Sequence, residues 1–258
     1  MNPFKNLIMN YTRRNFIKGG TIAGVSALAM TEIVTSAFAE AKVGKIAIGQ
    51  NNTILFQGDS ITDSGRKKDN IDPNNTSALG NGYPMIAGSE LLFKYPEKSL
   101  KVYNKGISGN KVYQLAERWD ADCLNLKPDV LSILIGVNDY WHKHDGHYNG
   151  TVDIYRNDFK ALLERTKKAL PNVKLIICEP FAVPNVKAVD KTWYPEFPEY
   201  QKAARDIANQ FDAAFIPFQS VFDKAVKSAP GVYWTGDGVH PSLAGAQLMA
   251  HAWGEVVK

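Results

Sequence analysis

The stretch Thr53-Ile-Leu-Phe56-Gln-Gly58-Asp59-Ser60-Ile-Thr62 decides how the rest of this chain is interpreted. The apolar run Thr53–Phe56 predicts a buried strand. Small polar residues follow it directly, and the carboxyl end of a strand is where an α/β protein presents reactive side chains. Ser60 is therefore a candidate nucleophile, the alternative being a turn serine that bonds its own backbone. Asp59 is expected to support the turn.

A second polar segment, Asp237-Gly-Val-His240-Pro241, supplies the groups that a serine needs for attack. A hydroxyl becomes a nucleophile when a base, itself oriented by a third group, removes its proton. Asp237 can orient His240, and the chain order Ser…Asp…His matches a known catalytic triad, although no Gly-x-Ser-x-Gly elbow is present. The structural alternatives are a loop histidine and a solvated turn carboxylate.

Two further segments follow apolar runs and carry candidate hydrogen-bond donors. They are Asn104-Lys-Gly106-Ile-Ser-Gly109-Asn110 and Ile135-Gly136-Val-Asn138-Asp139. Gly106 can bring its backbone N–H close to a developing oxyanion, and Asn138 can offer its side-chain NH₂. Each also has a structural alternative, as a strand-end glycine and as a turn cap.

These four segments together resemble the four blocks of the SGNH (GDSL-type) hydrolase family. The family's Ser, Gly, Asn and His fall in order on Ser60, Gly106, Asn138 and His240, and the resemblance runs from about Asn52 to the C-terminus. It implies a cofactor-free serine esterase with a Ser60–His240–Asp237 triad. Its oxyanion hole would consist of Ser60, Gly106 and Asn138.

Alternating strand and helix patterns predict an α/β fold of three layers. The expected strands are Thr53–Gln57, Leu100–Asn104, Val130–Ile135, Val173–Glu179 and Ala213–Pro217. The expected helices lie near Tyr83–Lys94, Lys111–Asp120, Thr151–Leu170, Glu199–Phe211 and Ser242–Val256, with polar loops at Asp69–Asn81 and Asn185–Pro198. We expect a flavodoxin-like arrangement, in which helices cover both faces of a central parallel sheet of about five strands.

Aromatic and polar side chains near Asn138 and in the 185–198 loop suggest the substrate. The residues expected to line the cleft are Tyr140, Trp141, His142, Trp193 and Trp234. Such a surface suits sugars, so the expected substrate is a short-chain ester, above all an O-acetyl group on a small-molecule or polysaccharide carbohydrate. A lipid-directed lysophospholipase or thioesterase is the nearest rival, and a non-catalytic carbohydrate-binding protein is an alternative of another class.

Histidine and cysteine residues raise two further questions. His142, His144 and His147 invite a metal interpretation, but their spacing matches no zinc signature, so no metal is expected. Cys178 lies in an apolar run and is expected to be a buried free thiol. A disulfide with Cys123 stays open at this point.

Composition limits the class of protein and its partners. A chain of 258 residues with 45% hydrophobic and 22% charged residues fits one soluble hydrolase domain, placed at 40–258. The net charge of +4 owes +3 to residues 1–39, so the remainder carries only +1. Without a basic stripe, nucleic acid is not an expected partner.

The N-terminus resembles an export signal. Arg13 and Arg14 precede Phe16, an apolar stretch covers Gly19–Met30, and Ala37-Phe-Ala39 provides a small-x-small cleavage site. The paired arginines resemble a twin-arginine signal. We expect residues 1–39 to be cleaved, leaving a periplasmic or secreted enzyme without a membrane span, the alternative being a retained anchor.

Overall fold

The computed structural model describes residues 30–39 and 44–258. Its centre is a parallel sheet of five strands in the order β2-β1-β3-β4-β5. The strands are β1 (Thr53–Gly58), β2 (Lys101–Asn104), β3 (Val130–Leu134), β4 (Lys174–Cys178) and β5 (Ala214–Ile216). The register pairs Ile54 with Val130 and Val130 with Lys174. The predicted α/β fold and its strands are confirmed.

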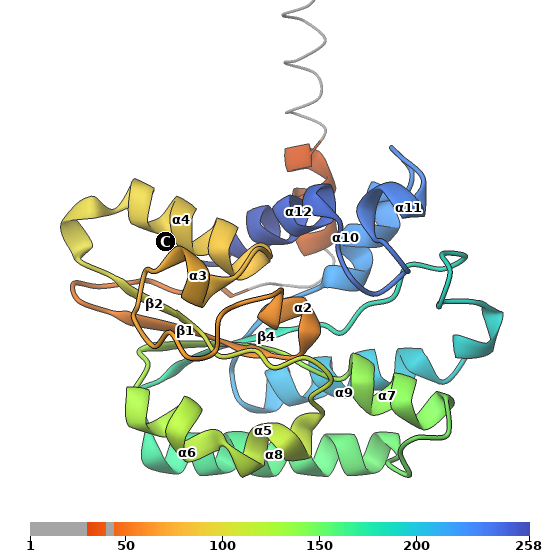
Figure 1. The fold of residues 1–258 in the computed structure, drawn as a ribbon, viewed down its shortest axis with the longest axis horizontal. Helices are drawn as coiled ribbons and strands as arrows, with labels where there is room; N and C mark the ends of the chain where they lie inside the picture. Colours follow the sequence, from red (N-terminus) through yellow and green to blue (C-terminus); the bar gives the residue numbers. More distant parts are fainter. Residues whose placement is uncertain (1–29, 40–43) are drawn as a thin grey trace, which may run out of the picture.

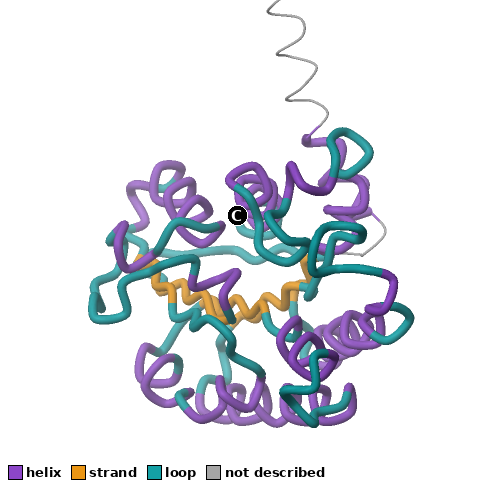
Figure 2. Tube along the Cα trace, turned by 45° about the vertical axis from the view of Figure 1, so that its right-hand side comes forward, coloured by secondary structure: helices purple, strands orange, loops and turns teal. Residues whose placement is uncertain are grey.

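Helices cover both faces of the sheet (Figure 1). One layer contains α3 (Thr76–Leu79), α4 (Tyr83–Lys94), α10 (Phe218–Ala225), α11 (Gly231–Trp234) and α12 (Leu243–Gly254). The other contains α5 (Val112–Glu117), α6 (Trp119–Asp122), α7 (Val137–His144), α8 (Val152–Ala169) and α9 (Phe197–Gln210). Figure 2 shows the strands between these two layers.

The parallel order explains where a site can form. The first strand in the chain, β1, has β2 on one side of it and β3, followed by β4 and β5, on the other. The order of strand addition therefore changes direction at β1. Ligands of such sheets bind at the carboxyl ends of the strands beside this change of direction. The segments after β1, β2 and β3 therefore meet at one edge, where the short helix α2 (Ser60–Asp63) also begins.

Several helix boundaries differ from the sequence prediction for local reasons. The Asp69–Asn81 loop contains α3, because the Asn75 side chain accepts hydrogen bonds from the N–H groups of Ser77 and Ala78. The expected helix Lys111–Asp120 is divided at Arg118 into α5 and α6. Pro198 stands in the first turn of α9, which thus begins before Glu199. Short 3₁₀ turns occupy Pro96–Lys98, Leu124–Leu126 and Lys191–Trp193.

Both cysteines are buried in the core. Cys123 and Cys178 are free thiols and form no disulfide. Cys178 ends β4, and its sulfur lies 3.6 Å from the Ser132 hydroxyl of the adjacent strand. The interpretation of Cys178 as a buried free thiol is therefore confirmed.

Residues 1–29 of the predicted export signal lie outside the described residues. Residues 30–39 are helical, and Val34 and Ala37 in this segment are fully buried against the domain. Within the described parts of the chain, no helix has both the length and the apolar character needed to cross a membrane.

Candidate active site

The turn after β1 fixes the position of Ser60. Gly58 has a φ of +157°, and a Cβ atom there would lie 2.4 Å from both the Leu134 carbonyl oxygen and the Thr62 hydroxyl. Only glycine fits this close approach of two segments. Asp59 then caps α2, because its Oδ1 accepts from the N–H of Ile61 at 3.0 Å. Ser60 is consequently the first residue of a helix at the sheet edge.

The structure brings His240 and Asp237 to this serine from the far end of the chain. The distance from Ser60 Oγ to His240 Nε2 is 2.8 Å, and that from His240 Nδ1 to Asp237 Oδ2 is 2.7 Å. A carboxylate only accepts, so Nδ1 carries the ring proton and Nε2 accepts from the serine hydroxyl. This is the arrangement that a general base requires.

Backbone hydrogen bonds keep the Asp237 carboxylate in place. Its Oδ1 accepts from the N–H groups of Val239 at 2.9 Å and His240 at 2.7 Å. Burial by itself would raise the pKa of Asp237, but these bonds and the His240 ring lower it below its ordinary value. Asp237 therefore stays ionised beside the imidazole.

Asn138 lies at the start of α7, close to the segment that follows β2. It is 5% exposed, and its Nδ2 donates one hydrogen bond to the Asn110 carbonyl at 3.2 Å. A primary amide has two N–H groups, so the second stays available. The helix α7 continues from Asn138 to His144.

The structure contradicts the prediction that Gly106 offers a free N–H. That single donor is bonded to Asn104 Oδ1 at 2.9 Å. Gly109, three residues later, is the better candidate: within the described chain its N–H has no hydrogen-bond partner. Gly109 lies between Ser108, which bonds Asp63 of α2, and Asn110, which bonds Asn138. Its φ of +81° lies in the left-handed region that favours glycine.

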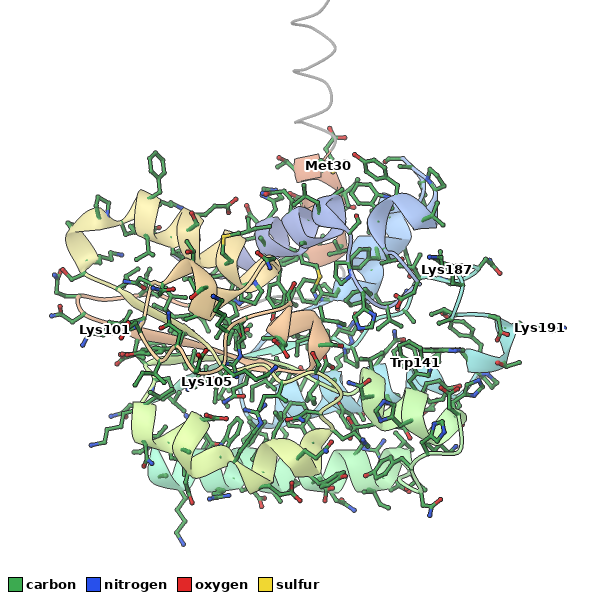
Figure 3. The ribbon with its side chains drawn as sticks, in the orientation of Figure 1. Met30, Lys101, Lys105, Trp141, Lys187 and Lys191 are labelled. Atoms are coloured by element: carbon green, nitrogen blue, oxygen red, sulfur yellow. The ribbon has the colours of Figure 1, made fainter. Side chains whose placement is uncertain are left out.

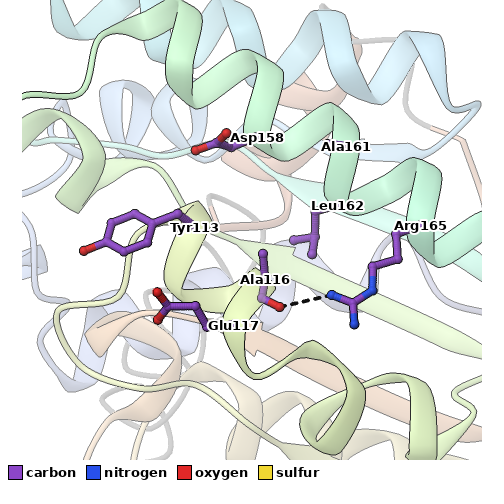
Figure 4. A pocket seen from close by; sticks show the side chains of 7 residues that line it. All are labelled: Tyr113, Ala116, Glu117, Asp158, Ala161, Leu162 and Arg165. Atoms are coloured by element: carbon purple, nitrogen blue, oxygen red, sulfur yellow. Dashed lines mark hydrogen bonds between the residues drawn. The ribbon is translucent and has the colours of Figure 1, made fainter.

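A pocket of about 280 Å³ opens beside the serine and the histidine. Its lining comes from α2, the start of α4 and the start of α12, and includes Ser60, Ser64, Asn81, Gly82, Tyr83, His240 and Leu243. A larger hollow of about 450 Å³ lies between α5 and α8, lined in part by Tyr113, Glu117 and Arg165 (Figure 4). It contains none of the three hydrogen-bonded residues Ser60, His240 and Asp237.

Three of the five predicted substrate-binding residues are buried, which contradicts that prediction. Tyr140, Trp193 and Trp234 are 0%, 1% and 3% exposed. Tyr140 and Trp193 pack against each other with ring centroids 5.1 Å apart, and the Trp234 Nε1–H donates to the Ala229 carbonyl. These three aromatic side chains are packed in the core and leave little surface for contact with a ligand.

Trp141 and His142 are half-buried, and Trp141 borders the site. The Trp141 ring centroid lies 6.2 Å from that of His240, on the side of α7 toward the 235–242 loop (Figure 3). His142 Nδ1 lies 2.9 Å from Lys111 Nζ. His144 instead bonds Thr192 at 3.0 Å. Across residues 30–39 and 44–258, no group of three His, Cys, Asp or Glu side chains is placed to hold a metal ion.

The fold and this edge of the sheet define a class of hydrolase, and comparison with known proteins identifies the family. A sequence model of the GDSL-like lipase/acylhydrolase family matches residues 56–248. The chain belongs to this family and is a carboxylic ester hydrolase.

Relatives of known structure agree with the fold. The chain is 34% identical over 214 residues to an acetylxylan esterase of Geobacillus stearothermophilus, covering 80% of this chain and 94% of that protein. The crystal structure of that esterase has a TM-score of 0.73 at 32% identity, covering 81% and 94% of the two chains. A GDSL-like lipase of Parabacteroides merdae has a TM-score of 0.81 at 51% identity, covering 82% and 98%.

Proposed function

We propose that this esterase removes acetyl groups from carbohydrates by nucleophilic catalysis at Ser60. The observation that carries the proposal is the unbroken hydrogen-bonded series from Ser60 Oγ through His240 to Asp237. Solved catalytic mutants of the Geobacillus acetylxylan esterase replace a serine, an aspartate and a histidine, the last two being three positions apart. Asp237 and His240 have the same spacing.

The geometry supports a two-step acyl transfer. His240 Nε2 takes the hydroxyl proton as Ser60 Oγ bonds to the ester carbonyl carbon, and the carbonyl oxygen becomes an oxyanion. The N–H groups of Ser60 and Gly109 and the second N–H of Asn138 are the donors that we assign to it. The imidazolium returns the proton to the leaving alcohol, and a water deprotonated by His240 then releases acetate.

The choice of a short acyl group rests on the pocket and on the relative. The pocket beside Ser60 is small, about 280 Å³, and polar Ser64, Asn81 and Ser242 interrupt its apolar lining of Ile61, Tyr83, Pro241, Leu243 and Ala246. An acetyl group needs little apolar surface, whereas each buried CH₂ of a longer chain gains about 0.8 kcal/mol from a continuous aliphatic groove. Trp141 and His142 are the two predicted substrate contacts that stay accessible.

The experiment compares acetyl, butyryl and octanoyl p-nitrophenyl esters and measures acetate released from acetylated xylan and pectin. We expect the highest kcat/KM with acetyl and release of acetate from at least one polysaccharide. A maximum at octanoyl without polysaccharide activity would favour a lipid-directed enzyme. Absence of turnover with every ester would favour a non-catalytic binding protein.

We propose in addition that the enzyme works in the periplasm or outside the cell, after removal of residues 1–39. The motivation is the Arg13-Arg14 pair followed by an apolar stretch and Ala37-Phe-Ala39. Replacing both arginines by lysine should retain the precursor in the cytoplasm, as measured by fractionation and N-terminal sequencing. Unchanged export would exclude the twin-arginine route.

A further inference from the structure

A lysine–histidine pair lies beside the proposed oxyanion donors and has no part in the mechanism above. Lys111 directly follows Asn110, whose carbonyl accepts from Asn138. His142 is four residues after Asn138 on α7, so the two side chains share one face of the helix. Lys111 Nζ and His142 Nδ1 are 2.9 Å apart. The pair thus connects the two segments that carry Gly109 and Asn138.

Lys111 is nearly buried; burial lowers its pKa, and the charge of the nearby Asp139 carboxylate opposes that shift. Lys111 is 7% exposed, and within the described chain no Asp or Glu oxygen forms an ion pair with it. Its Nζ instead lies 5.1 Å from the Tyr148 ring centroid and 5.8 Å from that of Tyr113, with Gln114 Oε1 at 3.4 Å. Aromatic faces stabilise an ammonium group that stays charged.

The ammonium determines the state of the histidine. It has three donors and no acceptor, so His142 Nδ1 must accept, and the neutral ring carries its proton on Nε2. Burial first and the charge of Lys111 second lower the pKa of His142, with His147 acting in the same direction and Asp145 opposing them. Among the described residues no hydrogen-bond partner exists for Nε2. His142 therefore presents a free N–H donor.

We propose that Lys111 holds His142 as a neutral imidazole whose Nε2–H binds an oxygen in the alcohol part of the substrate. The inference rests on the proposed function, since it assumes that the ester reacts at Ser60. An acetyl group has no oxygen beyond those at the reacting carbon, so a further acceptor must belong to the alcohol. In a carbohydrate this acceptor is a hydroxyl or ring oxygen, or the carboxylate of a uronic acid.

Nuclear magnetic resonance of the His142 ring nitrogens tests the role of Lys111 without any substrate. We expect a neutral ring with the proton on Nε2 at pH 7, and in Lys111→Met a higher pKa and loss of the fixed tautomer. Lys143→Met is the matched control, because Lys143 is the next residue on α7 but pairs with Glu196. A protonated His142 or a proton on Nδ1 in the wild-type enzyme at pH 7 would overturn the proposal.

Calorimetry with xylotetraose and with a galacturonic acid trimer tests the substrate contact and separates its two sources. We expect His142→Ala and Lys111→Met to weaken binding of one of them about 3- to 10-fold, as for one lost hydrogen bond, and His142→Gln to retain part of it. Binding of the neutral sugar identifies a hydroxyl or ring oxygen, and binding of the acidic one identifies the carboxylate. Equal binding by wild type and His142→Ala, or no binding of either probe, would overturn the contact.

Steady-state kinetics distinguish failure of this inference from failure of the proposed function. With an acetylated xylo-oligosaccharide, His142→Ala should raise KM about 3- to 10-fold at a nearly unchanged kcat, whereas the KM for p-nitrophenyl acetate, which has no carbohydrate oxygen, should rise much less. Equal losses on both esters would assign His142 to the general architecture and contradict the inference. Lack of wild-type activity on every glycan would instead contradict the proposed carbohydrate substrate, and the calorimetric result would still decide the contact.

Discussion

Two neighbouring regions of this esterase are built in opposite ways. At the sheet edge, Ser60, Asp237 and His240 are partly exposed and are held by hydrogen bonds from cap and turn backbone groups. Next to them, an aromatic cluster of Tyr140, Trp193, Phe197 and Tyr200 from α7, the 191–193 turn and α9 is at most 1% exposed. Ring centroids in this cluster are 5.1–5.6 Å apart.

The two regions are expected to affect different quantities: the aromatic cluster the free energy of unfolding, and the sheet edge the reaction rate. The aromatic cluster gains free energy by burying large apolar surfaces, which does not depend on the precise direction of any polar atom. On the proposed function, the sheet edge positions donors and acceptors whose contribution arises mainly in the transition state. Since α7 contributes Asn138 to one region and Tyr140 to the other, substitutions only two residues apart should give different phenotypes.

The largest effect is expected in the aromatic cluster. Trp193→Ala should lower the free energy of unfolding by about 3–5 kcal/mol, because it leaves a cavity where a fully buried indole packed. Urea unfolding gives this value. The remaining folded enzyme should turn over p-nitrophenyl acetate at nearly the wild-type rate. Trp141→Ala, at a half-buried position, is the control and should cost much less stability; equal losses would mean that the two regions are not distinct.

At the sheet edge, Asn138→Ala should affect rate instead. We expect kcat to fall about 10²-fold or more with little change in KM, as for the loss of one oxyanion donor. Asn138 also bonds the Asn110 carbonyl, so the melting temperature should be measured alongside. A raised KM at an intact kcat would assign Asn138 to ground-state binding.

The smallest expected effect concerns the buried cap of α2. Burial raises the pKa of Asp59 from 3.8 to about 7. The folded protein therefore retains a proton that the unfolded chain loses near its ordinary pKa, and this contribution to stability is lost as the pH rises through about 7. Between pH 5 and pH 8 the wild type should lose about 1–3 kcal/mol more of unfolding free energy than Asp59→Asn. Exposed Asp69→Asn is the control, and identical pH dependence in all three proteins would contradict the assignment.

Sequence reasoning succeeded where chemistry restricts both residue type and order. Strand ends, the Asp59 turn and the hydrogen-bonded proximity of Ser60, Asp237 and His240 follow from apolar runs and from groups that have few alternative uses, and the catalytic roles of the three residues stay predictions. It failed where one residue type serves two purposes. Tyr140 and Trp193 are as suitable for a core as for a sugar-binding surface, and only the tertiary packing decides between the two. The N–H of Gly106 is bonded to Asn104, whereas that of Gly109 is not. This difference depends on the conformation of the loop.

The central claim is that Ser60 is the nucleophile, and covalent labelling tests it most directly. A fluorophosphonate should attach to Ser60 of the enzyme, identified by peptide mass spectrometry, with stoichiometric loss of p-nitrophenyl acetate turnover. Ser60→Ala should be neither labelled nor active, its kcat falling by at least about 10³-fold. Ser64 and Ser108, the neighbouring serines, should stay unmodified. Labelling at either of them, or full activity in Ser60→Ala, would contradict the account.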